Sequence, residues 1–374
     1  MNILEEIQNC PVEWKELGEV VEVLDSLRRP ITKSQRIPGG IPYYGANGIQ
    51  DYVKDWIFDG TFILMGEDGS VIKNDNSPIL HWVIGKIWVN NHAHILGEVP
   101  GCALLKYVYY VLSQTDVSDI VRGTPPKLNQ KNLKSIKIPI PPLEIQEKIV
   151  QILDKMTEYV TELTSELTSE LTSRKKQYSY YRDKLLSFED EIYQVEWKTL
   201  GEVAENLDNM RKPVAKGGRS LGIYPYYGAS GIVDYVDSFI FDGDYLLISE
   251  DGANLVVRKT PIAFAISGKT WVNNHAHVLK FDNIINQKFV NYYLNYLDLS
   301  PYITGAAQPK LNQQNLNNIK IPYPSLEIQS RIVQVLDNFD KVCNDLNIGL
   351  PKEIELRQKQ YEYFREKLLT FVAE

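Results

Sequence analysis

Apolar and polar residues follow two different patterns along this chain, and each pattern predicts a different kind of structure. Short apolar runs bounded by glycine, proline and acidic residues predict β-strands at 61–66, 78–85 and 244–249. Two segments rich in tyrosine, 107–116 and 289–298, have the spacing of amphipathic helices with a buried aromatic side. These regions of predicted strands and short helices alternate with segments in which apolar residues recur every three or four positions.

The three-or-four spacing occurs in two stretches, which begin at Leu143 and Leu326. Each follows a proline-rich segment that is expected to be extended, because proline does not continue a helix. Such spacing is typical of a coiled coil, and a helix over 143–188 would be about 69 Å long. We expect the two helices to pair antiparallel. The predicted stripes are Ile145, Ile149, Ile152, Met156, Tyr159, Leu163 and Leu167 in the first helix, and Ile328, Ile332, Val335, Phe339, Val342, Leu346 and Leu350 in the second.

One heptapeptide, WVNNHAH, occurs at 88–94 and returns at 271–277, an offset of 183 residues. The same offset relates other motifs almost from end to end, so the chain is a tandem duplication of a domain-sized unit. A pseudo-twofold arrangement is the expected result. The shared motifs include EWK (13–15 and 196–198), LGEV (17–20 and 200–203), PYYGA (42–46 and 225–229), PKLNQ (126–130 and 309–313) and LEIQ (143–146 and 326–329).

The predicted fold class is α+β, with each repeat made of a globular α/β domain followed by a long helix. The expected segments are a first globular domain over 1–142, a first spacer helix over 143–190, a second globular domain over 191–325 and a second spacer helix over 326–374.

The first helix contains the run TELTSELTSELT at 161–172. One interpretation is a charged coiled-coil stretch whose leucines, Leu163, Leu167 and Leu171, face the partner helix. The other is an insert that sets length, since four residues add about 6 Å of helix, close to two base-pair steps of DNA. In the second helix, Gly349 and Pro351 are expected to kink or interrupt the corresponding stretch.

Composition restricts the class of protein further. The formal charge of −8 argues against a chain covered in nucleic-acid contacts but permits a local basic patch. The three cysteines are scattered, which fits a reducing cytoplasm and argues against a disulfide framework or a zinc ribbon. We expect neither a membrane span nor a secretory signal.

Catalytic motifs are missing from the sequence: it has no phosphate-binding glycine loop, no HExxH and no GxSxG. His92 and His94, with His275 and His277, lack a carboxylate or cysteine cluster at ligand spacing, so we predict no metal. The histidines are interpreted as polar residues satisfied by backbone, with DNA contact by Asn91 and His92, or Asn274 and His275, as the alternative.

The duplicated motif set resembles the specificity subunit of type I restriction–modification enzymes. The resemblance rests on EWK…LGEV, PYYGA, PKLNQ, the pair IKIPIPPLEIQEKIVQILDK and IKIPYPSLEIQSRIVQVLDN, and the pair RKKQYSYYRDKLL and RQKQYEYFREKLL. It spans essentially the whole chain, in order and in duplicate.

This resemblance implies a non-catalytic reader of double-stranded DNA in the cytoplasm. Each globular unit would be a target-recognition domain for one half of a bipartite site. The helices would form the spacer and the dock for two methyltransferase subunits, with restriction and translocase subunits joining for cleavage. S-adenosylmethionine, ATP and Mg²⁺ would belong to those partners, and this chain would hold no cofactor.

Candidate DNA contacts fall at matching positions in the two repeats. The most basic short stretches suit phosphate contact, or are simply solvated loops. Tyrosines beside a glycine are expected in a loop, either close to DNA or packed as an aromatic turn. The basic candidates are Arg28, Arg29, Lys33, Arg211, Lys212 and Lys216, and the tyrosines are Tyr43, Tyr44, Tyr226 and Tyr227.

Two further groups complete the candidates. The first is a stretch in which a lysine lies beside amide side chains, a combination that suits phosphates and base edges. Its candidates are Thr124, Lys127 and Asn129 in the first repeat, and Lys310 and Asn312 in the second. The stretch that differs most between repeats is the candidate for sequence readout, with ordinary hairpin variation as the alternative; it contributes Lys73 and Asn74, and Arg258 and Lys259.

Two rival interpretations remain at this stage. The first is a protein-interaction scaffold with two ligand-binding domains on a coiled-coil strut and no DNA. The second is an enzyme with a new site near Glu67, Asp68 and His92, although the repeated EDG is better explained as a tight turn with a left-handed glycine.

Overall fold

The computed structural model describes residues 3–69, 71–188, 195–305 and 308–371. The chain forms two compact units, one made of Met1–Glu166 with Ile354–Glu374 and the other of Leu167–Glu353. We call residues 3–140 the first globular domain, and residues 196–323 the second. The boundary predicted at residues 190 and 191 lies outside the described residues.

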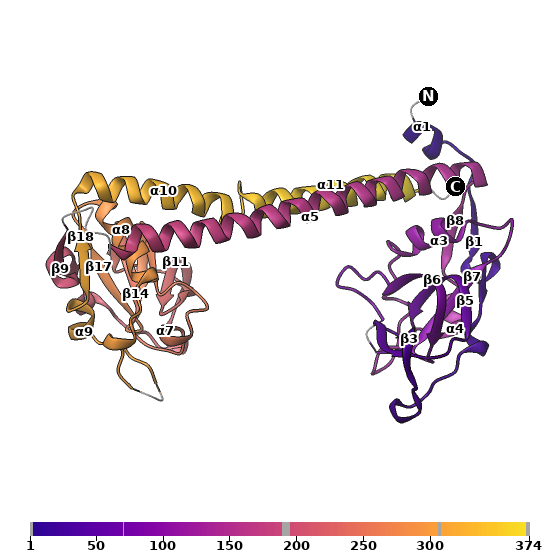
Figure 1. Ribbon diagram of the computed structural model, residues 1–374, viewed down its shortest axis with the longest axis horizontal. Helices are drawn as coiled ribbons and strands as arrows, with labels where there is room; N and C mark the ends of the chain where they lie inside the picture. Colours follow the sequence, from indigo (N-terminus) through magenta and orange to yellow (C-terminus); the bar gives the residue numbers. More distant parts are fainter. Residues whose placement is uncertain (1–2, 70, 189–194, 306–307, 372–374) are drawn as a thin grey trace. The chain divides into compact units, whose positions relative to one another are not determined.

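The first globular domain is built on a six-stranded sheet in the order β2-β7-β5-β6-β3-β4 (Figure 1). Only the β3–β6 pair is parallel. A separate antiparallel ribbon of β1 and β8 leads into the long helix. The elements are α1 (Ile3–Gln8), β1 (Glu13–Glu16), α2 (Leu17–Val20), β2 (Val21–Val23), β3 (Pro38–Gly45), β4 (Gly48–Val53), β5 (Phe58–Gly66), β6 (Leu80–Val89), β7 (Ala93–Glu98), α3 (Leu105–Leu112), α4 (Gln130–Lys134) and β8 (Lys137–Ile140).

The second globular domain repeats this plan, except that the counterparts of β5 and β6 are each split into two strands. Its two four-stranded sheets have the orders β10-β17-β14-β15 and β12-β11-β16-β13, and its ribbon pairs β18 with β9. The elements are β9 (Glu196–Thr199), α6 (Leu200–Val203), β10 (Glu205–Asn206), β11 (Leu221–Gly228), β12 (Gly231–Val236), β13 (Phe241–Asp242), β14 (Tyr245–Ser249), α7 (Asn254–Val257), β15 (Ala263–Ile266), β16 (Lys269–Val272), β17 (Ala276–Lys280), α8 (Ile284–Tyr296), α9 (Gln313–Asn317) and β18 (Lys320–Tyr323).

The predicted strands and amphipathic helices are present in both domains. The runs at 61–66 and 244–249 lie in β5 and β14, and the tyrosine-rich segments form α3 and α8. One expectation is wrong: Tyr43, Tyr44 and their counterparts lie at the ends of strands β3 and β11 instead of in loops. The Asn47–Gly48 turn closes a hairpin here, so the tyrosines before it belong to its first strand.

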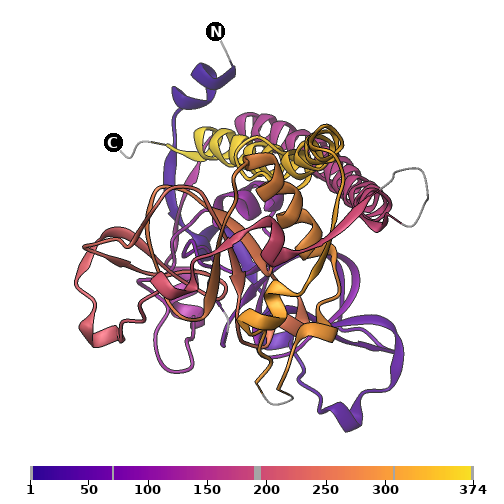
Figure 2. The ribbon, with the colours of Figure 1, turned by 90° about the vertical axis from the view of Figure 1, so that its left-hand side faces the viewer.

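The first spacer helix is continuous, and the second is interrupted. Helix α5 (Leu143–Ser187) has 45 residues. The second consists of α10 (Leu326–Asn344) and α11 (Leu350–Leu369), separated by a break at 345–349 that contains Gly349 and lies just before Pro351, as expected. Figures 1 and 2 show α11 beside α5 in the first unit and α10 beside α5 in the second.

Helix pairing is antiparallel within each unit. In the first, Thr157 and Tyr361 hydroxyls lie 2.9 Å apart, and the last turn of α11 reaches the core that holds the first turns of α5. In the second, Tyr178 and Tyr181 contact Phe339, and Leu186 shares a core with Ile332. Positions on α5 therefore rise in number as those of the partner helix fall.

The predicted stripes are correct only in part. Tyr159, Val335, Val342 and Leu346 are exposed, whereas Leu336 and Cys343 are buried. Val335 and Val342 are exposed because α10 packs chiefly on α8 of its own globular domain, where Lys288 and Tyr292 bond Asp337, and so buries a second face. Leu346 lies in the break between α10 and α11. Leu163, Leu167 and Leu171 of the tetrapeptide run are half-buried.

The last turn of each spacer helix packs into the core of a globular domain that belongs to the other repeat. Leu368 and Leu369 of α11 lie in the core of the first domain, and Leu186 of α5 lies in the core of the second. Leu186 and Leu369 are equivalent positions, 183 residues apart. Each repeat's helix therefore ends in the core of the other repeat's domain.

Among the described residues, none of the helices has the length and apolar character needed to span a membrane.

Candidate nucleic-acid interface

The repeated heptapeptide is a scaffold element that anchors the basic stretch of each domain. The indole Nε1–H of Trp88 donates to the backbone carbonyl of Arg29 at 2.6 Å, and Trp271 donates to the carbonyl of Lys212 at the same distance. The side chains of Arg29 and Lys212 remain exposed. The tryptophan thus fixes the backbone of the basic stretch while leaving its cations in solvent.

The asparagines of the heptapeptide form the turn that follows the strand. The buried side chain of Asn90 accepts a hydrogen bond from the backbone of His92 at 2.8 Å, and Asn273 does the same for His275. This turn leaves Asn91 and Asn274 exposed. The exposed rings of His92 and His275 pair with Asp68 at 2.5 Å and with Asp251 at 2.7 Å.

The second histidine of the heptapeptide lies in a buried charge cluster. We define the first cluster as Asp25, Arg28, Glu67, His94 and Lys127. His94 is only 1% exposed; its Nδ1 lies 2.6 Å from Asp25 Oδ2, and its Nε2 lies 2.7 Å from the Leu128 carbonyl. Arg28 bonds Glu67 at 2.5 Å, and the Lys127 ammonium lies 3.1 Å from the other Glu67 oxygen.

The second domain carries the same cluster, made of Asp208, Arg211, Glu250, His277 and Lys310. His277 lies 2.6 Å from Asp208 and 2.7 Å from the Leu311 carbonyl. Arg211 bonds Glu250 at 2.6 Å, and Lys310 lies 3.1 Å from Glu250. The two clusters therefore share the same set of ion pairs.

The carboxylates of both clusters are stabilised in their ionised form. Burial works to raise the pKa of Asp25, but the hydrogen bond and charge of His94 outweigh it and hold that pKa below the usual value. Burial likewise opposes ionisation of Glu67, yet Arg28, His94 and Lys127 together lower its pKa. Asp208 and Glu250 behave in the same way.

Three groups of each cluster have the types and spacing of metal ligands. Asp25, Glu67 and His94 bring ligand atoms within 4.8 Å of one another, as do their counterparts. Both nitrogens of His94 are already bonded to oxygen, however, and both oxygens of Glu67 face cationic nitrogens. The donor set is therefore that of an ion-pair network and does not fit a cation.

The cluster also holds the segment that carries the predicted lysine and amides. Gly69 N–H donates to Pro126 and Leu128 N–H donates to Glu67, which ties this segment to the EDG turn. Gly69 has a φ of 81°, the left-handed conformation expected for that turn. Asn129 accepts from the Asn132 N–H and caps α4, as Asn312 caps α9. The amides of Asn129 and Asn312 are thus partly engaged in capping, while Thr124, Lys127 and Lys310 remain exposed.

Several predicted contacts are brought together around each cluster. Those of the first domain are Arg28, Arg29, Asn91, His92, Lys127 and Asn129, and those of the second are Arg211, Lys212, Asn274, His275, Lys310 and Asn312. Arg28 and Arg211 are mostly buried within their clusters, because each already bonds a glutamate and at least two backbone carbonyls. The side chains available to a ligand are those of their exposed neighbours.

The tyrosines play a structural part. Tyr43 is 1% exposed, and its hydroxyl lies 3.3 Å from both the N–H and the carbonyl of Ile31. Tyr226 contacts Val214 in the same way. Both rings therefore anchor the loops that carry the exposed Lys33 and Lys216. Tyr44 and Tyr227 are half-buried.

Sequence reasoning missed two arginines that complete this arrangement. Arg36 lies 4.2 Å over the Tyr43 ring and pairs with Asp51, and Arg219 lies 4.3 Å over Tyr226 and pairs with Asp234. The signal that could have revealed them is the offset of 183, which both pairs obey.

The segment predicted to read sequence differs in structure between the domains. In the first, exposed Lys73 and Asn74 lie on a loop closed by the bridge between Ile72 and Pro78. In the second, the short helix α7 occupies this place. Arg258 follows α7 with a φ of 54°, and its guanidinium donates to backbone carbonyls at the end of α8, including Leu297 at 2.6 Å. Arg258 therefore stabilises the domain, and Lys259 is the exposed cation.

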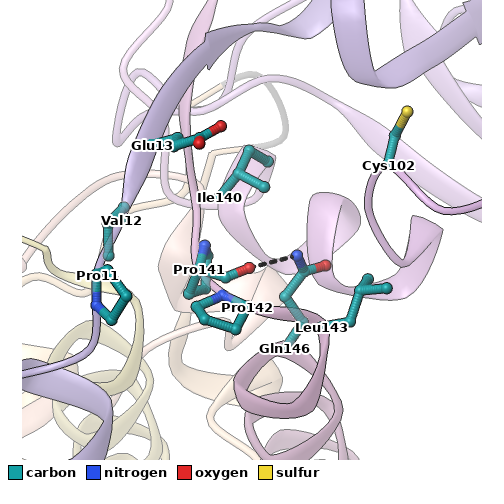
Figure 3. A pocket seen from close by; sticks show the side chains of 9 residues that line it. All are labelled: Pro11, Val12, Glu13, Cys102, Ile140, Pro141, Pro142, Leu143 and Gln146. Atoms are coloured by element: carbon teal, nitrogen blue, oxygen red, sulfur yellow. Dashed lines mark hydrogen bonds between the residues drawn. The ribbon is translucent and has the colours of Figure 1, made fainter.

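A shallow groove of 340 Å³ lies at the start of α5, apart from these contacts (Figure 3). Gln146 closes it: its amide donates to the Pro141 carbonyl at 2.8 Å and its oxygen accepts from Leu104 N–H at 2.9 Å. Gln329 donates to Pro324 in the second repeat. The glutamine of the shared LEIQ motif thus fixes the turn from ribbon to long helix.

Comparison with known proteins agrees with the duplication and with its spacing. The chain matches the family described as the type I restriction modification DNA specificity domain twice, at residues 11–173 and 194–356. It is 35% identical to a putative type I restriction enzyme specificity subunit of Haemophilus influenzae, over 98% of this chain and 97% of that protein. It is 36% identical to the Escherichia coli EcoR124I/EcoR124II specificity subunit, over 72% of this chain and 71% of that protein.

Solved structures show the same fold at low sequence identity. One, described in terms of complex assembly and conformational transition of the type I restriction–modification system, has a TM-score of 0.64 at 15% identity, covering 96% of this chain and 98% of that one. The specificity subunit from M. genitalium has a TM-score of 0.55 at 18% identity, with 98% of both chains covered. The fold and the two matched domains are those of tandem DNA-specificity proteins. This chain belongs to the family of type I restriction–modification specificity subunits.

Proposed function

We propose that this chain is the non-catalytic subunit that selects a bipartite site on double-stranded DNA, with one half-site read by each globular domain. The observation that carries the proposal is the duplication of the charge cluster beneath an exposed set of cations and amides. Two such surfaces on one chain suit two half-sites, and the family match in both repeats supports the assignment to DNA.

The candidate side chains divide into those that would contact phosphates and supply affinity, and those that would contact bases and select the sequence. Lysines and arginines that occupy matching positions in both domains suit phosphates, which carry no sequence information. They are Arg29, Lys33 and Lys127, with Lys212, Lys216 and Lys310. Base edges would be read by the segments that differ, around Asn74 in the first domain and Lys259 in the second.

Partner enzymes would supply catalysis. Two methyltransferase subunits need two equivalent docking surfaces, and the chain exposes an equivalent tryptophan and leucine at the start of each ribbon and each spacer helix: Trp14 and Leu143, and Trp197 and Leu326. Aromatic residues of this kind are frequent at protein interfaces. S-adenosylmethionine would bind to those subunits, and ATP and Mg²⁺ to restriction and translocase subunits. The three free cysteines suit the reducing cytoplasm where the DNA is located.

DNA binding of the chain alone, compared with that of the assembled methyltransferase complex, tests the proposal. Because the chain has a net charge of −8, we expect weak binding alone and tight binding in the complex. The affinity of the complex should fall steeply with salt, since phosphate contacts release counterions. A complex that assembles but shows no preference for any DNA sequence would favour an interaction scaffold instead.

A further inference from the structure

The buried histidine of each cluster is the feature that the proposed function leaves unexplained. A residue that contacts neither solvent nor DNA has no direct part in recognition, yet His94 and His277 occur at the same place in both domains with the same partners. Their hydrogen bonds decide the chemical state of the ring.

Both ring nitrogens of His94 face oxygen atoms. The partner of Nε2 is a backbone carbonyl, which can only accept, so Nε2 carries a hydrogen. The partner of Nδ1 is Asp25 Oδ2. The same carboxylate also accepts from Ile95 N–H at 3.0 Å and from Gln130 Nε2 at 3.4 Å, and Arg28 lies 3.6 Å from it.

A carboxylate surrounded by donors in this way is ionised and accepts from Nδ1 as well. His94 therefore donates from both nitrogens, which makes the ring an imidazolium cation. The remaining charged groups around it are Glu67, whose Oε2 lies 3.8 Å from Nδ1, and Arg28 and Lys127, which both bond Glu67. His277 has the equivalent surroundings in Asp208, Glu250, Arg211 and Lys310.

The protonated ring changes the charge of the whole cluster. Arg28, Lys127 and His94 supply three positive charges, and Asp25 and Glu67 supply two negative charges, so the cluster has a net charge of about +1 instead of zero. Lys127 is the exposed member, with 51% of its side chain accessible. The excess positive charge of the cluster is therefore accessible to solvent at the Lys127 ammonium.

We propose that His94 and His277 donate hydrogen bonds from both ring nitrogens and act as positioning residues that neutralise the buried carboxylates, so that Lys127 and Lys310 remain available to DNA phosphates. This inference rests on the proposed DNA-binding function and assigns a source to the local positive charge of an acidic protein. Without the buried cation, the two carboxylates would balance Arg28 and Lys127 completely, and the cluster would have no excess positive charge to attract a phosphate.

Nitrogen NMR of the full chain with labelled histidine tests the protonation state without DNA. The chain has five histidines, so the spectrum is simple, and His94→Gln and His277→Gln assign the two signals. At neutral pH we expect both nitrogens of His94 and His277 to bear hydrogen. A neutral ring at either position in the wild-type chain would overturn the proposal.

Salt-dependent DNA binding of the assembled complex tests the consequence. For His94→Gln, the slope of log K against log salt should fall by about 0.9, the value of one phosphate contact, and for His94→Gln with His277→Gln by about 1.8. Adding Glu67→Gln to His94→Gln restores the net charge and should restore most of the slope. His81→Gln, a half-buried histidine outside the cluster, is the matched control and should leave the slope unchanged.

An unchanged slope in His94→Gln, or no recovery on adding Glu67→Gln, would contradict the positioning role even with a protonated ring. The two proposals also fail differently. A wild-type complex that shows no sequence-specific DNA binding removes the proposed function and this inference with it. A complex that binds DNA normally through neutral histidines removes this inference alone.

Discussion

The two globular domains have matching buried charge clusters but expose different side chains above them. Corresponding contacts to the cluster histidine have the same lengths, 2.6 and 2.7 Å, in both domains. The first strand of the hairpin, in contrast, exposes Pro38 and Gly40 in the first domain, and Leu221 (88%) and Ile223 (79%) in the second. Buried ion pairs permit little change without a large cost, whereas exposed positions vary freely.

The segment after the EDG turn shows the same contrast more strongly. A polar loop with Lys73 and Asn74 in the first domain is replaced in the second by α7, which exposes Val256 and Val257. A common scaffold with different exposed chemistry is the arrangement expected when two domains hold the same kind of ligand but read different sequences in it. The comparison can be tested by changes to either part.

The largest change removes one of the two repeats. A fragment of residues 1–190 should form a homodimer, because Leu186 of one copy can occupy the place of Leu369 in the domain of the other. Sedimentation measures this directly. A fragment that ends at residue 180, and so lacks Leu185, Leu186 and Phe188, is the matched control and should remain monomeric. A monomeric 1–190 fragment would contradict the exchange of helix ends.

The exchanged leucines predict a loss of stability that is confined to one domain. Leu369→Ala should destabilise the first domain, and Leu186→Ala the second, by about 2–5 kcal/mol each, as for other buried leucines. Hydrogen exchange resolved by residue reports the two domains separately. If Leu369→Ala instead lowered protection in the second domain, or Leu186→Ala in the first, the helix ends would not be exchanged between repeats.

Substitutions in the variable segments should alter one half-site at a time. Asn74→Ala should relax selection in the half-site of the first domain, and Lys259→Ala in that of the second, by about 1–3 kcal/mol if each side chain contacts a base bidentately. Methylation rates on DNA that varies in one half-site measure this. The half-site of the other domain is the internal control, and equal effects on both half-sites would identify these residues as phosphate contacts.

Acid should affect both domains alike, because their clusters match. The lowered pKa values of Asp25, Glu67, Asp208 and Glu250 mean that these carboxylates stabilise the fold above their unfolded pKa values. This contribution is lost as pH falls through the folded values. At neutral pH the carboxylates are ionised and this loss of stability does not occur, so it is the smallest of the four predicted effects. Urea unfolding across the acid range measures it. Asp25→Asn should flatten the pH dependence of the first domain only.

Much of this architecture could be predicted from the sequence, because the relevant signals are local or repeated. The offset of 183 revealed the duplication, and Gly349 with Pro351 marked the break in the second helix. The stripe on α10 failed at Val335 and Val342, because α10 packs on a globular domain as well as on another helix, and periodicity alone does not distinguish two partners.

The candidate site was harder to predict because its partners are distant in sequence. Arg28 was recognised as basic, but its partner Glu67 is 39 residues away and the carbonyl bonded by His94 is 34 residues away. Residue type alone therefore suggested exposed DNA contacts at Arg28, Arg211 and Arg258. In the structure, all three guanidiniums are engaged within the domain, and the exposed cations are their neighbours Arg29, Lys212 and Lys259.

A map of methylated bases tests the central claim most directly. The chain would be expressed with its methyltransferase subunit in cells without other methylation, with each protein alone as a control. The account predicts methylation only when both are present, in a motif of two short half-sites separated by a fixed gap of unspecified bases. A methyltransferase complex that is assembled and active but modifies a single continuous motif, or no defined motif, would contradict the claim that each domain reads one half-site.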